Sequence, residues 1–418
     1  MEIGIFGMGA MGRKYAERFA EKGYLVHGTD LPENIERLNE LYASNGNIRI
    51  HPDGRDVARL SDIQFYSVPV DEIGNAVKAY GPSTKLDAIV GGQCSVKTPE
   101  IIALRRYLPE DTHIITSHSL HGPGANFEGQ TLAVIRDRAS DEKYAAAMGI
   151  FSELGSNIVE MDYDNHDQVT ADTQAVTHLG FLSMGTAWRK MGGMPWDDGA
   201  YVGGIDNTKI LMMLRIHGGT PHVYSGLAIH NSHAKQQVKQ YNKSVSELFE
   251  MMISGNKSDF RERIGFAGDF VFGAHNDEKR LMLDDEVLGE YSLGYASEKR
   301  PNSHLSLFAM LDAWNQLQIN PYDNMICQTP PFKLRLGIVE YLARDANLLR
   351  ESIEAAMNNL EIRKDDLAFT LAVNEWASVI EHDDIDGYHT KFEKNRKYFV
   401  DKIPDGKRLS GELISRLK

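Results

Sequence analysis

The segment Glu2-Ile3-Gly4-Ile5-Phe6-Gly7-Met8-Gly9-Ala10-Met11-Gly12 decides the fold of this 418-residue chain. Its beginning reads as a short buried strand, and its end forms the pattern G-x-G-x-x-G. A helical run from Arg13 to Lys22 follows, and a second apolar segment, Tyr24 to Thr29, ends at Asp30. A strand, this glycine pattern, a helix and a second strand form the context in which the motif binds a dinucleotide.

The three glycines have different expected roles. Gly7 permits a tight turn, Gly9 lets the backbone approach a pyrophosphate, and Gly12 lets helix and strand pack closely, while the helix N-terminus attracts phosphate. A carboxylate at Asp30 would meet the adenosine ribose, which favours a dinucleotide site over an ordinary glycine-rich turn. The expected cofactor contacts are Gly7, Met8, Gly9, Ala10, Met11, Gly12 and Asp30, with Ser67, Val68, Pro69 and Gln93 following later strands.

Composition excludes several classes of protein. A net charge of −14 argues against a general binder of nucleic acid or of anionic membranes. The two cysteines, Cys94 and Cys327, rule out a disulfide scaffold or a cysteine-rich zinc site, and they suit a reducing compartment. No apolar run approaches the roughly 20 residues that span a bilayer. Because the first expected strand starts at residue 2, we expect no targeting peptide and a cytoplasmic protein with no metal.

The character of the sequence changes near residue 163. Residues 1–163 alternate strand-like and helix-like segments, which predicts an α/β Rossmann domain with a doubly wound, mostly parallel sheet. Residues 164–418 show mostly helical periodicity, which predicts an all-α domain that binds substrate and forms a homodimer. Asp164 to Met191 reads as one long helix, and residues 192–204 and 273–302 read as connections.

The chemistry is expected at the carboxyl ends of the strands, where open parallel sheets bind ligands. Three predicted strands are followed there by residues 67–69, 91–97 and 117–123, and the last two stretches are rich in polar side chains. His118 is the sharpest candidate, because an imidazole can take a proton from an alcohol as its hydride leaves. The structural alternative is a histidine that caps a strand end. His121 has the same alternative in a weaker position.

Three neighbours of this edge have two readings each. Ser95 could hydrogen-bond the same hydroxyl, or it could be a turn residue before a helix. Lys97 could face a phosphate or carboxylate, although such lysines are more often solvated. Cys94 has no evident activating neighbour, so we expect a small packing residue.

The predicted helical half carries further candidates. Thr170, Gln174 and His178 are spaced by four residues and share one helix face, which suggests a wet cleft or else a solvent-facing stripe. Arg215 follows the apolar run Leu211–Leu214, so its guanidinium needs an anionic partner, either a substrate carboxylate or an internal aspartate.

Four segments together resemble prephenate dehydrogenase, most closely its fungal branch. They are Gly-Gly-Gln-Cys-Ser-Val-Lys at 91–97, His-Ser-Leu-His-Gly-Pro at 118–123, His-Asp-Gln-Val-Thr-Ala-Asp-Thr-Gln-Ala-Val-Thr-His at 166–178 and Pro-Asn-Ser-His-Leu-Ser-Leu at 301–307. The resemblance extends over nearly the whole chain. It implies a Rossmann domain followed by a helical dimerisation domain, and oxidative decarboxylation of prephenate to 4-hydroxyphenylpyruvate in tyrosine biosynthesis.

The resemblance also implies residue roles. His118 matches the catalytic histidine and Ser95 a serine that helps to hold the substrate hydroxyl or the nicotinamide. His178, with Gln174 on the same helix face, lies on the substrate side, and Arg215 matches the arginine that holds a carboxylate. Tyr224 stands where bacterial relatives place a tryptophan. The fungal branch implies NADP, whereas Asp30 favours NAD because a carboxylate repels a 2′-phosphate.

Two other functions stay open at this stage. Arogenate dehydrogenase would share the site and read an amino group in place of the keto group. A non-catalytic dinucleotide sensor could dispense with His118, Ser95 and Arg215. The enzymatic hypotheses both expect the His118 imidazole and the Arg215 guanidinium to act on one bound substrate.

Overall fold

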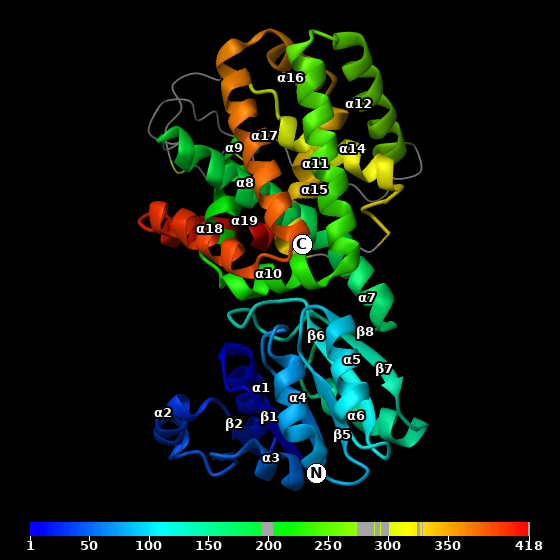
Figure 1. The fold of residues 1–418 in the computed structure, drawn as a ribbon, viewed down its shortest axis with the longest axis vertical. Coiled ribbons are helices and arrows are strands. Elements are labelled where there is room, and N and C mark those ends of the chain that lie inside the picture. The colour runs from blue at the N-terminus through cyan, green and yellow to red at the C-terminus, as the bar shows by residue number, and fades with distance from the viewer. Residues whose placement is uncertain are drawn as a thin grey trace. The chain divides into compact units, whose positions relative to one another are not determined.

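The computed structural model describes residues 1–193, 204–273, 288, 293, 301–323, 327 and 329–416. They form two compact units, Met1–Thr170 and Ala171–Lys418, which we treat separately (Figure 1). The division lies at the end of helix α7 (Tyr163–Thr170), whereas the sequence places the domain boundary between residues 163 and 164, at its beginning. The predicted connections at 192–204 and 273–302 lie mostly outside the described residues.

The first unit is built on one eight-stranded sheet of order β3-β2-β1-β4-β5-β6-β7-β8. Neighbouring strands are parallel except β6 and β7, which are antiparallel. The order reverses between β1 and β4, and doubly wound sheets bind ligands at this kind of switch point. The strands are β1 Glu2–Phe6, β2 Leu25–Thr29, β3 Ile48–Ile50, β4 Ile63–Tyr66, β5 Ile89–Gly92, β6 His113–Ser119, β7 Thr131–Arg138 and β8 Asn157–Glu160.

Helices cover both faces of this sheet, so the predicted Rossmann architecture is confirmed. On one face, Tyr15 and Phe19 of α1 pack with Phe65 of β4 and Phe151 of α6 in the main apolar core. On the other, α3, α4, α5 and α7 form consecutive contacts. The helices are α1 Ala10–Glu21, α2 Pro32–Tyr42, α3 Gly54–Leu60, α4 Ile73–Tyr80, the 3₁₀ turn Gly81–Ser83, α5 Lys97–Tyr107, α6 Asp141–Ser152 and α7.

Three local features differ from the sequence prediction. Strand β3 and helix α3 were not predicted, because a three-residue edge strand and a seven-residue helix are too short to establish a periodicity. Strand β6 continues to Ser119, since Ser119 pairs with Leu132 of the antiparallel strand β7. His118 therefore lies within β6, and its expected position just beyond a strand end is wrong.

The second unit is helical throughout its described residues. Buried Trp376 of α17 donates a hydrogen bond to Thr186 of α8 at 2.8 Å, which joins two of the central helices. No helix in the described parts of the chain is long and apolar enough to cross a bilayer. The helices are α8 Val176–Met191, α9 Ile205–His217, α10 Pro221–His230, α11 Ser232–Ile253, α12 Lys257–Phe272, α14 Leu305–Leu317, α15 Pro330–Arg344, α16 Ala346–Asn358, α17 Leu360–Glu381, α18 Ile385–Tyr398 and α19 Ile403–Arg416.

The predicted long helix from Asp164 to Met191 is present, but its residues Ala171–Ala175 form a π-helix between α7 and α8. A π turn shifts the backbone hydrogen-bond register and frees carbonyl groups. The fully buried Arg335 of α15 donates to the carbonyl oxygens of Val176 and Thr177 at 3.2 and 3.1 Å. A buried arginine thus supplies the donors that the irregular turn lacks.

Candidate active site

The glycine turn between β1 and α1 has the geometry that the sequence predicts. Gly7 has a φ of +93°, and a Cβ there would lie 2.5 Å from the carbonyl oxygen of Ser67 in the loop after β4. A Cβ at Gly12 would overlap the carbonyl oxygen of Gly7. A Cβ at Gly9 would meet nothing within 4 Å. The first and third glycines are needed by the fold itself, whereas the space beside Gly9 is open to a ligand.

The carboxylate of Asp30 holds this turn in place. Its Oδ2 accepts the backbone N–H of Met8 at 2.5 Å. Its Oδ1 accepts the backbone N–H of Leu31 at 2.8 Å and the side-chain amide of Asn34 at 2.7 Å. A carboxylate has about four lone-pair positions, so three are engaged by the protein and little capacity is left for a ribose hydroxyl.

The predicted residues of the next two strand ends lie at the same edge of the sheet. Ser67 follows β4 and its N–H donates to Phe6 of β1 at 2.7 Å. Gln93 follows β5, and both polar atoms of its side-chain amide are buried without a hydrogen-bond partner. Ser95 is half-buried in the same loop, before α5. Open space at Gly9 and an unpaired amide at Gln93 are both features that a bound dinucleotide would use, so these residues fit such a cofactor.

His118 is buried near the end of β6, with 8% of its surface exposed. Burial, together with the neighbouring His166, Lys97 and His121, lowers the pKa of His118 well below its usual value. The imidazole is therefore neutral at physiological pH, which is the form that accepts a proton. His121 is half-buried, and its Nδ1 lies 3.0 Å from the carbonyl oxygen of Gly122.

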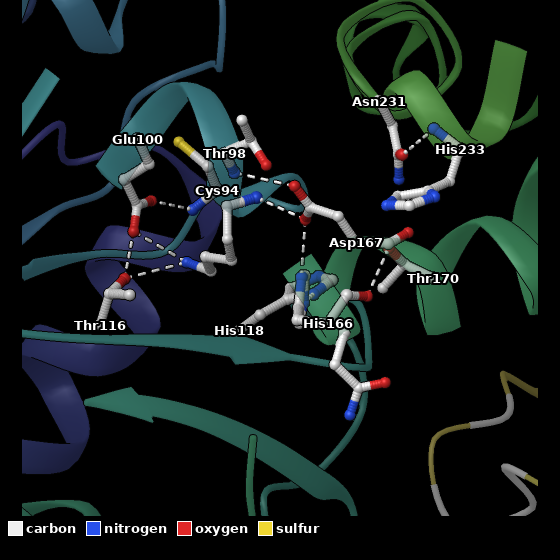
Figure 2. Close-up of polar contacts among 12 residues, drawn as sticks. Cys94, Thr98, Glu100, Thr116, His118, His166, Asp167, Thr170, Asn231 and His233 are labelled. Carbon is white, nitrogen blue, oxygen red and sulfur yellow. Dashed lines mark hydrogen bonds and ion pairs between the residues drawn. The ribbon is translucent and has the colours of Figure 1, made fainter. Parts of the chain in front are cut away.

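Both readings of Lys97 are wrong. Its ammonium group is fully buried, so it is not solvated, and it is engaged by the chain itself (Figure 2). It forms an ion pair with Glu100 at 3.0 Å and donates to Thr116 Oγ1 at 3.0 Å and to the carbonyl oxygen of Ser117 at 2.7 Å. Cys94 is buried as expected, and its N–H donates to Glu100 at 2.9 Å. This cluster ties the β5–α5 loop to β6.

In the second unit, three of the four predicted residues come together. The ring of His178 on α8 meets the ring of Tyr224 on α10 edge-on, with centroids 4.8 Å apart. Arg215 on α9 interacts electrostatically with Tyr224. Gln174 lies in the π segment, and both Gln174 and His178 are about nine-tenths buried, which excludes a solvent-facing stripe.

Arg215 has the environment of an anion-binding group. Its Nη1 donates to Ser410 Oγ at 3.2 Å, and within the described residues it forms no ion pair with a carboxylate. Burial lowers the pKa of its guanidinium, although Tyr224 opposes this effect. A partly buried cation without a carboxylate partner favours the substrate reading of Arg215 over the internal-aspartate reading.

Two residues that contact the candidate base were not recognised from the sequence. His166 of α7 lies 2.8 Å from His118, measured from Nε2 to Nδ1, and Asp167 lies 2.9 Å from the other ring nitrogen of His166. Both belong to the motif at 166–178, but only its later positions were given roles. A buried histidine–aspartate pair at the start of a helix was the available signal.

Comparison with known proteins agrees with this geometry. The chain is 42% identical, over 420 residues, to a probable prephenate dehydrogenase [NADP(+)] of Schizosaccharomyces pombe, with 100% of this chain and 97% of the relative covered. It is 43% identical to prephenate dehydrogenase [NADP(+)] of Saccharomyces cerevisiae, with 99% and 93% covered. The chain belongs to the prephenate dehydrogenase family.

Two further matches agree with membership of the prephenate dehydrogenase family. Residues 175–418 match a family model for a 6-phosphogluconate dehydrogenase C-terminal domain. The crystal structure of prephenate dehydrogenase from A. aeolicus, in complex with hydroxyphenyl propionate and NAD+, aligns with a TM-score of 0.51 at 20% identity. That alignment covers 63% of this chain and 94% of the other, and it supports the fold. The resemblance seen in the sequence motifs is thus confirmed.

Proposed function

We propose that this chain is an NADP-dependent prephenate dehydrogenase that converts prephenate to 4-hydroxyphenylpyruvate in tyrosine biosynthesis. The observation that carries the proposal is full-length identity above 40% to two fungal relatives of that name. The neutral, buried imidazole of His118 at the carboxyl edge of the sheet supports it physically. The enzyme would be an oxidoreductase that acts on a CH–CH donor.

The reaction divides into a redox change and a bond cleavage. A bound oxidised nicotinamide accepts the hydride that leaves C4 of prephenate. In our assignment His118 accepts the proton of the C4 hydroxyl, Ser95 helps to hold that hydroxyl, and the C1 carboxylate leaves as CO₂ to give the aromatic ring. The protein's main task is to orient C4 and to stabilise the positive character that develops at the alcohol.

The substrate is a dianion in a protein of net charge −14, so it needs a local cation. We assign that role to Arg215, whose guanidinium has no carboxylate partner among the described residues. His178 and Tyr224, in ring contact at 4.8 Å, would form a wall of the substrate site, and Gln174 would add a polar contact.

The cofactor contacts are assigned to the glycine turn, residues 7–12, to Asp30, to the loop of residues 67–69 and to Gln93. Asp30 does not exclude NADP, because three hydrogen bonds from the chain already engage its carboxylate. Arg37 lies one contact away, since its Nη2 donates to Asn34 Oδ1 at 3.5 Å and Asn34 donates to Asp30. We propose Arg37 as a cation for the 2′-phosphate; Arg37→Ala should then raise the KM for NADP+ and leave that for NAD+ unchanged.

One assay tests the function directly. The purified protein is given prephenate or arogenate with NADP+ or NAD+, and the absorbance of the reduced nicotinamide is followed. We expect the highest kcat/KM with prephenate and NADP+. Faster turnover of arogenate would support that alternative, and a lack of reduction with either substrate would revive the non-catalytic sensor.

We further propose a cytoplasmic homodimer that forms through the helical unit. Helix α17 carries three leucines spaced along one face, and Leu360, Leu367 and Leu371 are 68%, 46% and 55% exposed. Exposed apolar stripes of this kind often mark protein interfaces. Light scattering after gel filtration should give a dimer for the wild-type protein and a monomer for the Leu367→Glu, Leu371→Glu double variant. A wild-type monomer would exclude the proposal.

A further inference from the structure

Two residues to which the proposed reaction gives no role, His166 and Asp167, form a buried line of hydrogen bonds that ends on His118 (Figure 2). His118 Nδ1 and His166 Nε2 are 2.8 Å apart, and His166 Nδ1 and Asp167 Oδ1 are 2.9 Å apart. His166 and Asp167 are each 1% exposed. All three residues belong to the first compact unit.

The carboxylate at the end of the line is firmly held. Its two oxygens accept the backbone N–H groups of Lys97 at 2.7 Å and Thr98 at 2.8 Å (Figure 2). These are the first residues of α5, whose preceding residue Val96 provides no side-chain cap. A carboxylate at a helix N-terminus is stabilised by the free N–H groups and the helix dipole. Asp167 therefore also acts as the missing cap of α5.

The protonation states follow from these surroundings. Burial raises the pKa of Asp167, but the hydrogen bonds from His166 and from the start of α5 outweigh it and hold the pKa below its usual value. Burial lowers the pKa of His166, although Asp167 opposes the shift, and Lys97 lowers it further. At neutral pH the line thus consists of one carboxylate and two neutral imidazoles.

The positions of the protons can then be deduced one by one. An ionised carboxylate only accepts, so His166 must carry its proton on Nδ1. A neutral imidazole has one N–H, so His166 Nε2 is an acceptor, and it must receive a proton from His118 Nδ1. His118 then has no proton on Nε2. Within the described residues this nitrogen has no hydrogen-bond partner of its own.

We infer that His166 and Asp167 are positioning residues that hold His118 in the tautomer protonated on Nδ1, with the lone pair of Nε2 free to accept the substrate proton. The identity of that proton rests on the proposed function, but the tautomer is a property of the protein alone. The arrangement extends the logic of a catalytic triad, in which a carboxylate fixes the tautomer of the basic histidine.

Nitrogen NMR of the full-length protein, labelled with ¹⁵N-histidine, tests the tautomer without substrate. The signals of His118 are identified by their loss in His118→Asn. We expect Nε2 to resonate as an unprotonated nitrogen in the wild-type protein and in His166→Gln, because the glutamine amide can accept from His118 and donate to Asp167. In His166→Leu the acceptor is absent, and Nε2 should become protonated.

The kinetic test separates positioning from general stability. His166→Leu should lower kcat by roughly 10²–10³-fold, within the range of general-base effects, with the KM values for prephenate and NADP+ little changed. His166→Gln should retain kcat within about tenfold. His121→Gln is the matched control, since its ring lies outside the line and it should retain both kcat and the tautomer.

Either of two results overturns the inference: a protonated Nε2 in the wild-type protein, or equal behaviour of the glutamine and leucine variants. Thermal unfolding of each variant shows whether a loss of kcat reflects a loss of structure. If the tautomer is as expected but prephenate is not turned over, the proposed function fails while the positioning role stands.

Discussion

The protonation state of His118 decides whether this side chain can act as a base. Replacing it with asparagine keeps a polar group on β6 but removes the basic nitrogen. We expect His118→Asn to lower kcat by ~10²–10⁴-fold, the usual contribution of general acid–base catalysis. Steady-state kinetics measures the loss, and titration with NADP+ should show unchanged cofactor affinity.

The pH dependence adds an independent check at the same residue. Because burial and the neighbouring groups depress the pKa of His118, its neutral form persists as the pH falls through the ordinary histidine range. The wild-type kcat should therefore begin to fall only well below about pH 6.5. Full activity in His118→Asn would remove this residue from the mechanism.

Arg215 is predicted to act on binding rather than on chemistry. Arg215→Ala removes a charged donor, and lost hydrogen bonds to a charged group are worth about 1.5–3 kcal/mol, or roughly 10- to 100-fold in KM for prephenate. The KM for NADP+ should stay the same. Ser410→Ala, which removes the hydroxyl that accepts from Arg215, is the matched control and should have a small effect. A loss confined to kcat would contradict the assignment.

The turn between β1 and α1 offers a test at the scale of the element. Gly12→Ala would place a methyl group against the carbonyl oxygen of Gly7, and such overpacking costs about 1–3 kcal/mol or more. Gly9→Ala meets no protein atom within 4 Å, so it should cost less than about 1 kcal/mol while weakening NADP+ binding. Denaturant unfolding and cofactor titration separate the two effects. Normal cofactor affinity in Gly9→Ala would place the pyrophosphate elsewhere.

The junction of β5, α5 and β6 depends on the buried pair of Lys97 and Glu100. Lys97→Met would leave the Glu100 carboxylate buried without its cation, and breaking such a pair costs about 3–5 kcal/mol. The double variant Lys97→Met, Glu100→Gln removes both charges and should recover part of the loss. Urea unfolding measures both, and equal stability of the single variant and the wild-type protein would show that the pair is not structural.

Elements with a clear periodicity were predictable from the sequence. The strands on either side of the switch point and the helices around them were, because their apolar runs are long enough to repeat. The position of His118 within β6 was not, since the antiparallel pairing with β7 that extends this strand comes from a distant segment. Lys97 and Asp167 were misread or overlooked for the same reason, as their partners lie far away in the sequence.

At the scale of the whole molecule, the change from alternating to helical periodicity predicts an α/β unit followed by a helical one. The structure has both. The buried Arg335 was not predicted, because a cation amid Phe332, Leu334 and Leu336 looks like an ordinary exposed position in a helix. Its partners are carbonyls that the π segment frees on another helix, and a local pattern carries no such information.

The most direct test of the account is a crystal structure of the protein with NADP+ bound. We predict the pyrophosphate beside Gly9 at the start of α1, and the nicotinamide ring at the carboxyl ends of β5 and β6, with C4 facing the space next to His118 Nε2. A nicotinamide ring bound away from that edge, or a His118 that is remote from C4, would contradict the assignment of this histidine as the base.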